Sequence, residues 1–243
     1  DNNQLTFTNG NVNTLTTINV DASALTDDVD TFRVTLDASQ TDADFAFNVT
    51  GSEEDDTFEK RNDGVDNNVD FMGGAGNDNF ILNASDAGST TAYNGGDGTD
   101  TLTLSGGQIV DDGFVSMQDL EVLDSEAGVA LNARLGVEAD RAANDAQAFT
   151  LQGSALGDDV VVDAAFDDDL IINMNGGDDN FDVSASSGTV TFNDAAGNVD
   201  ANDTLKGGTG AGDVMNLTAD NGTADLSTTS NVETFNVVES GDN

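Results

Sequence analysis

Two nine-residue peptides carry the residue types best suited to chemistry in this chain. Residues 73–81 read Gly-Gly-Ala-Gly-Asn-Asp-Asn-Phe-Ile, and residues 95–103 read Gly-Gly-Asp-Gly-Thr-Asp-Thr-Leu-Thr. Both fit the pattern G-G-x-G-x-D-x-U-x, where U is a large apolar residue, and the aspartates Asp78 and Asp100 lie 22 residues apart. Glycines allow backbone carbonyl oxygens to turn toward a cation, and the aspartate adds charged oxygen ligands. This composition predicts binding of a hard, calcium-type cation.

A degenerate third copy lies one further period toward the N-terminus. Residues 51–59 keep the first glycine, the aspartate at position six (Asp56) and the apolar residue at position eight (Phe58). Three copies in register predict a periodic structure in which a carboxylate and an apolar side chain recur at the same corner of every coil. The candidate ligands of this first series are Asp55, Asp56, Gly73, Ala75, Asn77, Asp78, Gly95, Asp97, Thr99 and Asp100.

A second acidic, glycine-rich series occupies residues 153–214. Its spacing from Asp158 to Asp179 is 21 residues and from Asp179 to Asp203 is 24 residues, so the coil length is kept with small insertions. We therefore expect several Ca²⁺ ions along the chain. The candidate ligands of this second series are Asp158, Asp178, Asp179, Asp203 and Asp213.

At these residues the chain resembles the RTX (repeat-in-toxin) family of calcium-binding repeats, and the bacterial surface-layer and adhesin proteins that carry them. The resemblance is strong at residues 73–81 and 95–103 and is reduced elsewhere to isolated Asp-x-apolar triplets. It implies secretion, commonly through an uncleaved C-terminal signal. The spacing of 22 residues exceeds the two nonapeptides of a regular RTX roll, which favours a wider solenoid with calcium at some corners.

Short runs of Val, Thr, Phe and Leu between clusters of Gly, Asn and Asp predict short strands. Because side chains alternate between the two faces of a strand, Phe58, Phe80 and Leu102 should form one internal stack, and Phe181 with Leu205 another. The predicted fold is all-β: a parallel, right-handed β-solenoid, similar to a β-helix or β-roll, with coils of about 22 residues and two tandem halves.

The predicted halves follow from a recurring apolar element at residues 29–34, 120–123 and 232–237 that alternates with the acidic series. Residues 1–124 form the first half and residues 148–243 the second. The alanine-rich residues 125–147 form a linker, as either a short helical excursion or a plain loop. Because the chain closes on the element with which it opens, we expect a repeating unit or an excerpt, with a complete, capped domain as the alternative.

The charge balance restricts the partners. The chain has 47 acidic and 6 basic residues, a net charge of −41, and no Cys, Pro, His or Trp. Such self-repulsion destabilises a compact state unless counterions neutralise it, and divalent cations are the first candidates, with general salt adaptation as the alternative. The chain is a poor candidate for binding nucleic acid or an anionic membrane, because like charge opposes both. No apolar run is long enough to predict membrane insertion.

Two other functions compete with a structural role. Paired acids such as Asp158-Asp159 could serve in glycoside hydrolysis, but adjacent residues of a strand point to opposite faces, so we predict no enzyme. The Thr-x-Thr pairs at residues 6–8, 101–103 and 189–191 could bind ice, yet they do not recur at every coil. Solvent-facing threonine is the preferred interpretation.

We therefore expect a calcium-stabilised, extracellular structural module that self-assembles head to tail into a bacterial surface layer or matrix filament. The partners are copies of the chain itself, with cell-surface polysaccharide as a further candidate. The alternative function is a spacer or ligand-binding segment of a large RTX-type adhesin, including ice or carbohydrate binding. The expected location is the cell surface or the extracellular matrix.

Overall fold

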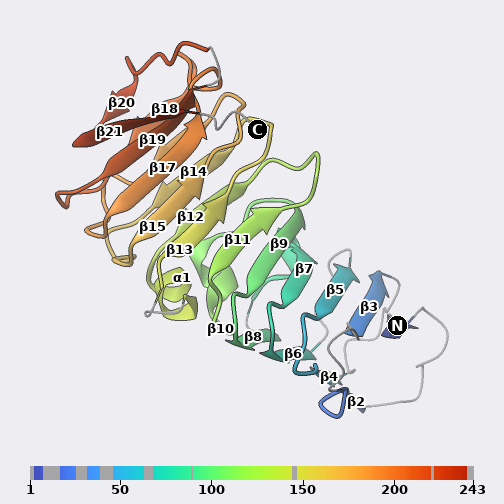
Figure 1. The fold of residues 1–243 in the computed structure, drawn as a ribbon. Helices are drawn as coiled ribbons and strands as arrows, with labels where there is room; N and C mark the ends of the chain where they lie inside the picture. Colours follow the sequence, from blue (N-terminus) through green and yellow to red (C-terminus); the bar gives the residue numbers. More distant parts are fainter. Residues whose placement is uncertain are drawn as a thin grey trace.

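The chain winds into a β-solenoid. The computed structural model describes residues 3–7, 17–25, 32–38, 46–62, 68–88, 90–143, 147–219 and 222–239. These residues form parallel sheets with coils of about 22 residues, which confirms the fold class and coil length predicted from the sequence (Figure 1). Among them, no helix is long and apolar enough to cross a membrane.

One sheet, sheet A, runs the whole length of the solenoid. It has 11 parallel strands in sequence order, so each coil adds one strand beside the last. These strands are β1 (Asn3–Phe7), β3 (Phe32–Ala38), β5 (Thr57–Asn62), β7 (Asn79–Asn83), β9 (Thr101–Gly106), β11 (Val122–Ser125), β13 (Phe149–Gln152), β15 (Leu170–Asn173), β17 (Val190–Ala195), β19 (Val214–Ala219) and β21 (Thr234–Glu239).

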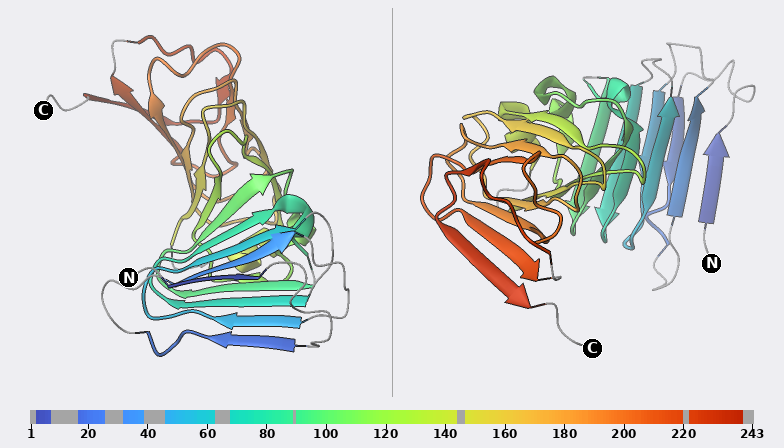
Figure 2. Two further views of the ribbon diagram at one scale, coloured as in Figure 1. Left: turned by 90° about the vertical axis from the view of Figure 1, so that its right-hand side faces the viewer. Right: turned by 90° about the horizontal axis from the view of Figure 1, so that it is seen from above.

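Two shorter sheets of 5 strands each close the coils. Sheet B serves the N-terminal half and comprises β2 (Thr17–Asp21), β4 (Ala46–Thr50), β6 (Asn68–Ala75), β8 (Thr91–Asp97) and β10 (Met117–Gln118). Sheet C serves the C-terminal half and comprises β12 (Asn132–Leu135), β14 (Asp159–Val162), β16 (Asn180–Asp182), β18 (Thr204–Lys206) and β20 (Thr229–Ser230). Figure 2 shows that the strands near the C-terminus are turned relative to those near the N-terminus, as the twist of sheets requires.

The core consists of inward side chains stacked coil upon coil. Phe58 pairs in register with Phe80, and Phe80 with Leu102, and all three are fully buried. The rings of Phe58 and Phe80 stack with centroids 5.1 Å apart. In sheet C, Phe181 pairs with Leu205, also buried. Both stacks predicted from the sequence are therefore confirmed.

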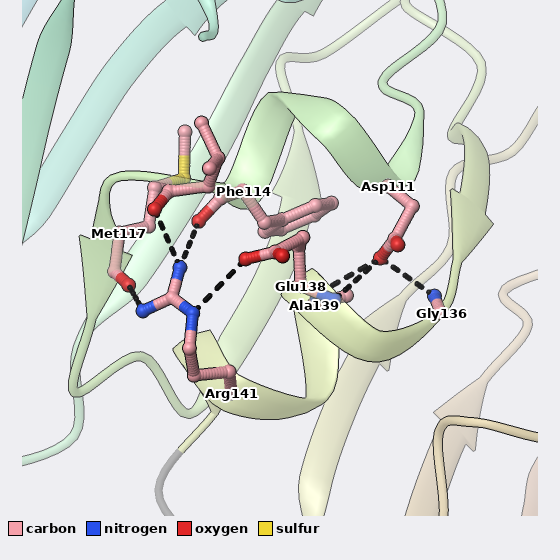
Figure 3. A network of polar contacts seen from close by, with 8 residues as sticks. Asp111, Phe114, Met117, Gly136, Glu138, Ala139 and Arg141 are labelled. Carbon is pink, nitrogen blue, oxygen red and sulfur yellow. Dashed lines mark hydrogen bonds and ion pairs between the residues drawn. The ribbon is translucent and has the colours of Figure 1, made fainter. Parts of the chain in front are cut away.

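Sheet B ends and sheet C begins at a junction of short helices (Figure 3). The 3₁₀ helix η2 (Asp111–Phe114) packs against the helix α1 (Val137–Ala142), and a second 3₁₀ helix, η1, spans Ala84–Asp86. Residues 125–147, expected as a linker, thus contain a short helix, but they also contain β12, which pairs with β14. This segment therefore contributes to the wall of the solenoid.

Two side chains hold the junction together. Asp111 Oδ1 accepts hydrogen bonds from the backbone N–H groups of Gly136, Glu138 and Ala139, and so caps the start of α1 from the preceding coil. The Arg141 guanidinium donates to the backbone carbonyls of Phe114, Val115 and Met117 and pairs with Glu138. Figure 3 shows these contacts crossing between the two helices.

Candidate metal centre

The first series of aspartates forms a ladder at the turn that leads into sheet A. Asp56, Asp78 and Asp100 are buried, and each immediately precedes a strand of that sheet. Each Oδ1 atom accepts a hydrogen bond from the backbone N–H one coil earlier: Phe32 to Asp56, Asp56 to Asp78, and Asp78 to Asp100, each 2.8 Å. The carboxylates therefore tie neighbouring coils together where the sheet pairing ends.

The second series forms a ladder at a different corner. Asp158, Asp179 and Asp203 precede strands of sheet C, and their Oδ1 atoms accept the backbone N–H groups of Leu131, Asp158 and Asp179 at 2.7 to 3.0 Å. Asp213 instead precedes β19 of sheet A and accepts the N–H of Val190 at 2.8 Å. The second series therefore divides between two corners of the solenoid.

The second carboxylate oxygen, Oδ2, separates six of these seven aspartates into two classes. In four of them it accepts a backbone N–H from the turn just before the aspartate, so both carboxylate oxygens are capped. The four bonds run from Ser52 to Asp56, Ser154 to Asp158, Asp200 to Asp203 and Gly208 to Asp213, at 2.6 to 2.7 Å. These four carboxylates act as internal caps of the turns.

Asp78 and Asp100 form the other class, because their Oδ2 atoms are buried and accept no hydrogen bond from the described residues. The reason lies in the backbone conformation of the glycines four positions before them. At the position that Ser52 occupies before Asp56, Gly74 and Gly96 adopt φ values of +116° and +101° and continue sheet B, where they pair with each other. Gly74 and Gly96 therefore direct no backbone N–H at the Oδ2 atoms of Asp78 and Asp100, which stay buried without a hydrogen-bond donor among the described residues.

Backbone carbonyl oxygens approach the same places. A Cβ atom added to Gly73 would collide with both Asp78 Oδ2 and the carbonyl oxygen of Gly95. One added to Gly95 would collide with both Asp100 Oδ2 and the carbonyl oxygen of Asp119. At each position a carboxylate oxygen and a carbonyl oxygen, both acceptors, therefore flank one glycine. This donor set fits a hard cation such as Ca²⁺ and contains no nitrogen or sulfur.

Burial makes the charge on this ladder costly. It raises the pKa of Asp78 to about 8, with the neighbouring carboxylates of Asp100 and Asp56 adding to the effect. Burial also raises the pKa of Asp100 to about 6, and that of Asp179 in the second ladder to about 8. A bound cation would offset this cost, since an opposite charge nearby favours the ionised carboxylate.

The remaining predicted ligands lie outside the ladders of buried carboxylates. One residue before the first ladder, an exposed ladder connects Asp55, Asn77 and Thr99: Asp55 Oδ1 accepts the N–H of Asn77, and Asn77 Oδ1 accepts the N–H of Thr99. Asp97 and Asp178 are also exposed, and Ala75 ends β6. The structure thus brings Asp78 and Asp100, with Gly73 and Gly95, into the arrangement that best fits a cation.

Two glutamates in the ladders were missed from the sequence. Glu121 accepts the N–H of Asp100 at 2.6 Å, and Glu233 accepts the N–H of Asp213 at 2.9 Å. Both occupy the ladder position just before a strand of sheet A. The signal was present, because each glutamate lies in the recurring apolar element, but the longer side chain breaks the Asp-x-apolar pattern.

One further cluster of carboxylates lies away from the ladders. Single oxygens of Asp140, Asp167 and Asp168 lie within 4.8 Å of one another, and Asp140 Oδ1 accepts the N–H of Asp167. Asp167 is exposed and the other two are half-buried. Exposed acidic groups of this kind are common on a chain of net charge −41.

No family model, curated protein or solved structure matches the chain. The resemblance to RTX repeats therefore depends on the two nonapeptides, residues 73–81 and 95–103. These peptides contain Asp78 and Asp100 with the glycines that precede them.

Proposed function

We propose that the chain is a calcium-stabilised structural module of an extracellular assembly, a bacterial surface layer or a matrix filament. The observation that carries the proposal is the pair of buried Oδ2 atoms of Asp78 and Asp100, which lack hydrogen-bond donors among the described residues. An unpartnered, buried, charged oxygen costs several kcal/mol, in the order of magnitude known for such groups. A fold that repeats this feature in adjacent coils gains stability from a cation.

Calcium acts in this proposal by stabilising the folded coils. An ion that binds only the folded state adds about 2.7 kcal/mol at a free concentration of 100 times its dissociation constant. Asp78 and Asp100 would hold the ions together with the carbonyl oxygens beside Gly73 and Gly95. A long, rigid rod is the mechanical consequence, because the ladders connect the successive coils from β3 to β21.

Copies join through the outer strands of sheet A. Phe235 and Val237 of β21 pair in register with Met215 and Leu217 of β19, which are buried in the core. No described coil covers Phe235 and Val237, which are 45% and 71% exposed. An open strand edge with apolar side chains is a template for another strand. We assign that strand to a second copy of the chain, which gives a head-to-tail contact that does not close.

Sedimentation velocity of the purified chain tests this function. In excess calcium, we expect the sedimentation coefficient to increase with protein concentration, and electron microscopy to show rods longer than one module. In a chelator, both signs of assembly should disappear. An intact chain that remains monomeric in calcium at high concentration would contradict the proposal.

A binding face on sheet A is the second candidate function. Threonine does not recur there at every coil, but it does at every second one: Thr57, Thr101, Thr150, Thr191 and Thr234 share an outward column in which Asn79, Val122, Ile171 and Val214 alternate with them. The next outward column is an amide ladder, in which each Nδ2 donates to the preceding coil, through Gln152, Asn173, Asn193, Asn216 and Asn236.

These ten outward side chains of β13 to β21 contain no charge, on a chain of net charge −41. A neutral, hydroxyl-rich ligand such as a polysaccharide suits such a face. Retention on an insoluble neutral polysaccharide, abolished by Asn193→Asp but not by Asp163→Asn away from this face, would support the adhesin function.

A further inference from the structure

The two outer strands of sheet A belong to the same columns of side chains. In β1, Leu5 pairs with Val34 and Phe7 with Leu36, both in the inward columns. In β21, Phe235 and Val237 pair with Met215 and Leu217 of the same two columns. Followed strand by strand, one inward column therefore begins at Leu5 and ends at Phe235. The apolar side chains of β1 and β21 each have a neighbouring strand on one side. The strand at the other end carries apolar side chains that could pack on the second side.

The end strands are also nearly free of charge. β1 reads Asn-Gln-Leu-Thr-Phe and has no ionisable side chain, while β21 reads Thr-Phe-Asn-Val-Val-Glu and has one, at its last residue. In a chain of net charge −41, these are segments that can approach a second copy without opposed carboxylates. Charge therefore favours contact between the ends over contact between most other surfaces.

The carboxylate ladder has a matching group at each end. Among the described residues, the last ladder residue is Glu233. Its backbone N–H occupies the same position in its coil as the Asp213 N–H, which donates to Glu233, occupies in the coil before. At the other end, Asn3 is the register partner of Phe32, whose N–H is bound by Asp56. Asn3 thus stands in the ladder position and carries an uncharged side-chain oxygen that can accept the N–H of Glu233.

We propose, building on the assembly function above, that β21 of one copy pairs in parallel with β1 of the next copy in one defined register. In this register Phe235 faces Leu5, Asn236 faces Thr6, Val237 faces Phe7 and Glu233 meets Asn3. A slip by one residue would turn Leu5 and Phe7 outward and place Thr6 against the core. The inward columns, the outward face and the carboxylate ladder then continue without interruption through the joint.

Disulfide trapping tests the register, because the chain contains no cysteine of its own. Thr6 and Asn236 are exposed and would face each other across strands about 4.8 Å apart, within the Cα separation that a disulfide spans. Within one copy the same two residues lie ten strand spacings apart, about 48 Å, so no internal bridge can form. The test protein is the full chain with Thr6→Cys and Asn236→Cys, oxidised mildly in calcium.

The expected result is a series of covalent multimers on a non-reducing gel. The control pair, Thr6→Cys with Val238→Cys, keeps both cysteines on the outward face but displaces them by two residues, beyond roughly 7 Å, so its multimers should be lost. A mixture of the two single variants Thr6→Cys and Asn236→Cys should yield dimers and nothing larger, and neither single variant alone should form dimers.

Three results would overturn the inference, and they separate it from the assembly function. Equal cross-linking of the control pair would contradict the register. Dimers from a single variant alone would contradict the head-to-tail polarity. Rods in calcium without a Thr6→Cys to Asn236→Cys bridge would contradict this joint while leaving assembly intact, whereas a chain that stays monomeric would contradict the assembly function itself.

Discussion

Each ladder aspartate uses its two carboxylate oxygens for different purposes. One oxygen accepts a backbone N–H from the preceding coil in every ladder, from Asp56 to Asp213. The other oxygen accepts a turn N–H where Ser52 or Ser154 precedes, and accepts none where Gly74 or Gly96 precedes. A ladder aspartate is therefore a cap in one coil and a candidate cation ligand in another, depending on whether the preceding turn directs an N–H at its Oδ2 atom.

Isosteric amides distinguish these two uses. In Asp78→Asn, the side-chain oxygen can still accept the N–H of Asp56, and the new NH₂ group can donate to the facing carbonyl of Gly95. We expect metal-free stability to be kept or raised and the stabilisation by calcium to be reduced. Asp158→Asn should instead lose about 1–3 kcal/mol, because both of its oxygens already accept N–H groups.

Urea unfolding of both variants, with calcium and with a chelator, measures these effects. Equal loss of stability in the two variants without calcium would contradict the division into caps and candidate ligands.

The raised pKa values predict an unusual dependence of stability on pH. Asp78 and Asp179 have folded pKa values of about 8 and Asp100 of about 6, all above the ordinary value of 3.8, because the carboxyls are buried. Between the unfolded pKa of 3.8 and the folded pKa of about 8, the folded state binds more protons than the unfolded state. The free energy of unfolding therefore falls as pH rises from about 4 through about 8. The metal-free chain should melt at a lower temperature at about pH 9 than at about pH 5.

Calorimetry in a chelator across this range measures the slope. The double variant Asp78→Asn with Asp179→Asn should flatten it, and a wild-type melting temperature that is constant or rises with pH would refute this view of the ladders.

At this scale, the sequence predicted the ladder aspartates but not their division. The glycine and aspartate pattern is visible in the sequence, whereas the direction of a single N–H, at Ser52 or at Gly74, depends on backbone geometry. Glu121 and Glu233 were hidden because a carboxylate on a longer side chain can reach the same backbone group.

Among the elements, the strands can be predicted from the alternation of apolar and polar side chains. The sheet to which each strand belongs cannot. Phe58, Phe80 and Leu102 were placed inward by their period alone, and the register confirms it. The aspartates of the second series look the same in the sequence, yet Asp179 leads into sheet C and Asp78 into sheet A. The same Asp-x-apolar triplet can precede a strand of any sheet, so it does not indicate which face of the solenoid the strand occupies.

The junction between sheets B and C depends on long-range contacts. Asp111 reaches the start of α1 from 25 residues earlier, and Arg141 reaches the carbonyl of Met117 from 24 residues later. The alanine-rich composition predicted a helix as one alternative, but a six-residue helix is too short to be stable alone and depends on these two caps.

Truncation of the aromatic stack tests the energetics of the elements. Phe80 is fully buried between Phe58 and Leu102, so Phe80→Ala should cost about 3–5 kcal/mol through lost burial and the cavity left behind. Met72→Ala, on the outward face of β6 and 50% exposed, is the matched control and should cost much less. Similar midpoints for the two variants in urea unfolding would contradict the core assignment.

Across the whole molecule, the internal cations cannot balance the acids. The basic side chains in described ion pairs, Arg33, Arg134, Arg141 and Lys206, are each bound to a carboxylate, and Lys60 is buried. The net charge of −41 therefore has to be balanced from solution. In the proposed assembly, this excess of charge favours contact through the nearly uncharged strands β1 and β21.

Thermal unfolding of the metal-free chain during calcium addition tests the central claim most directly. We expect the melting temperature to rise and saturate, because an ion bound only by the folded coils adds about 2.7 kcal/mol at 100 times its dissociation constant. Magnesium at equal ionic strength should have a smaller effect, since it demands a tighter, octahedral set of ligands. Asp78→Asn with Asp100→Asn should remove most of the rise, and an unchanged rise in that double variant, or none in the wild type, would contradict the account.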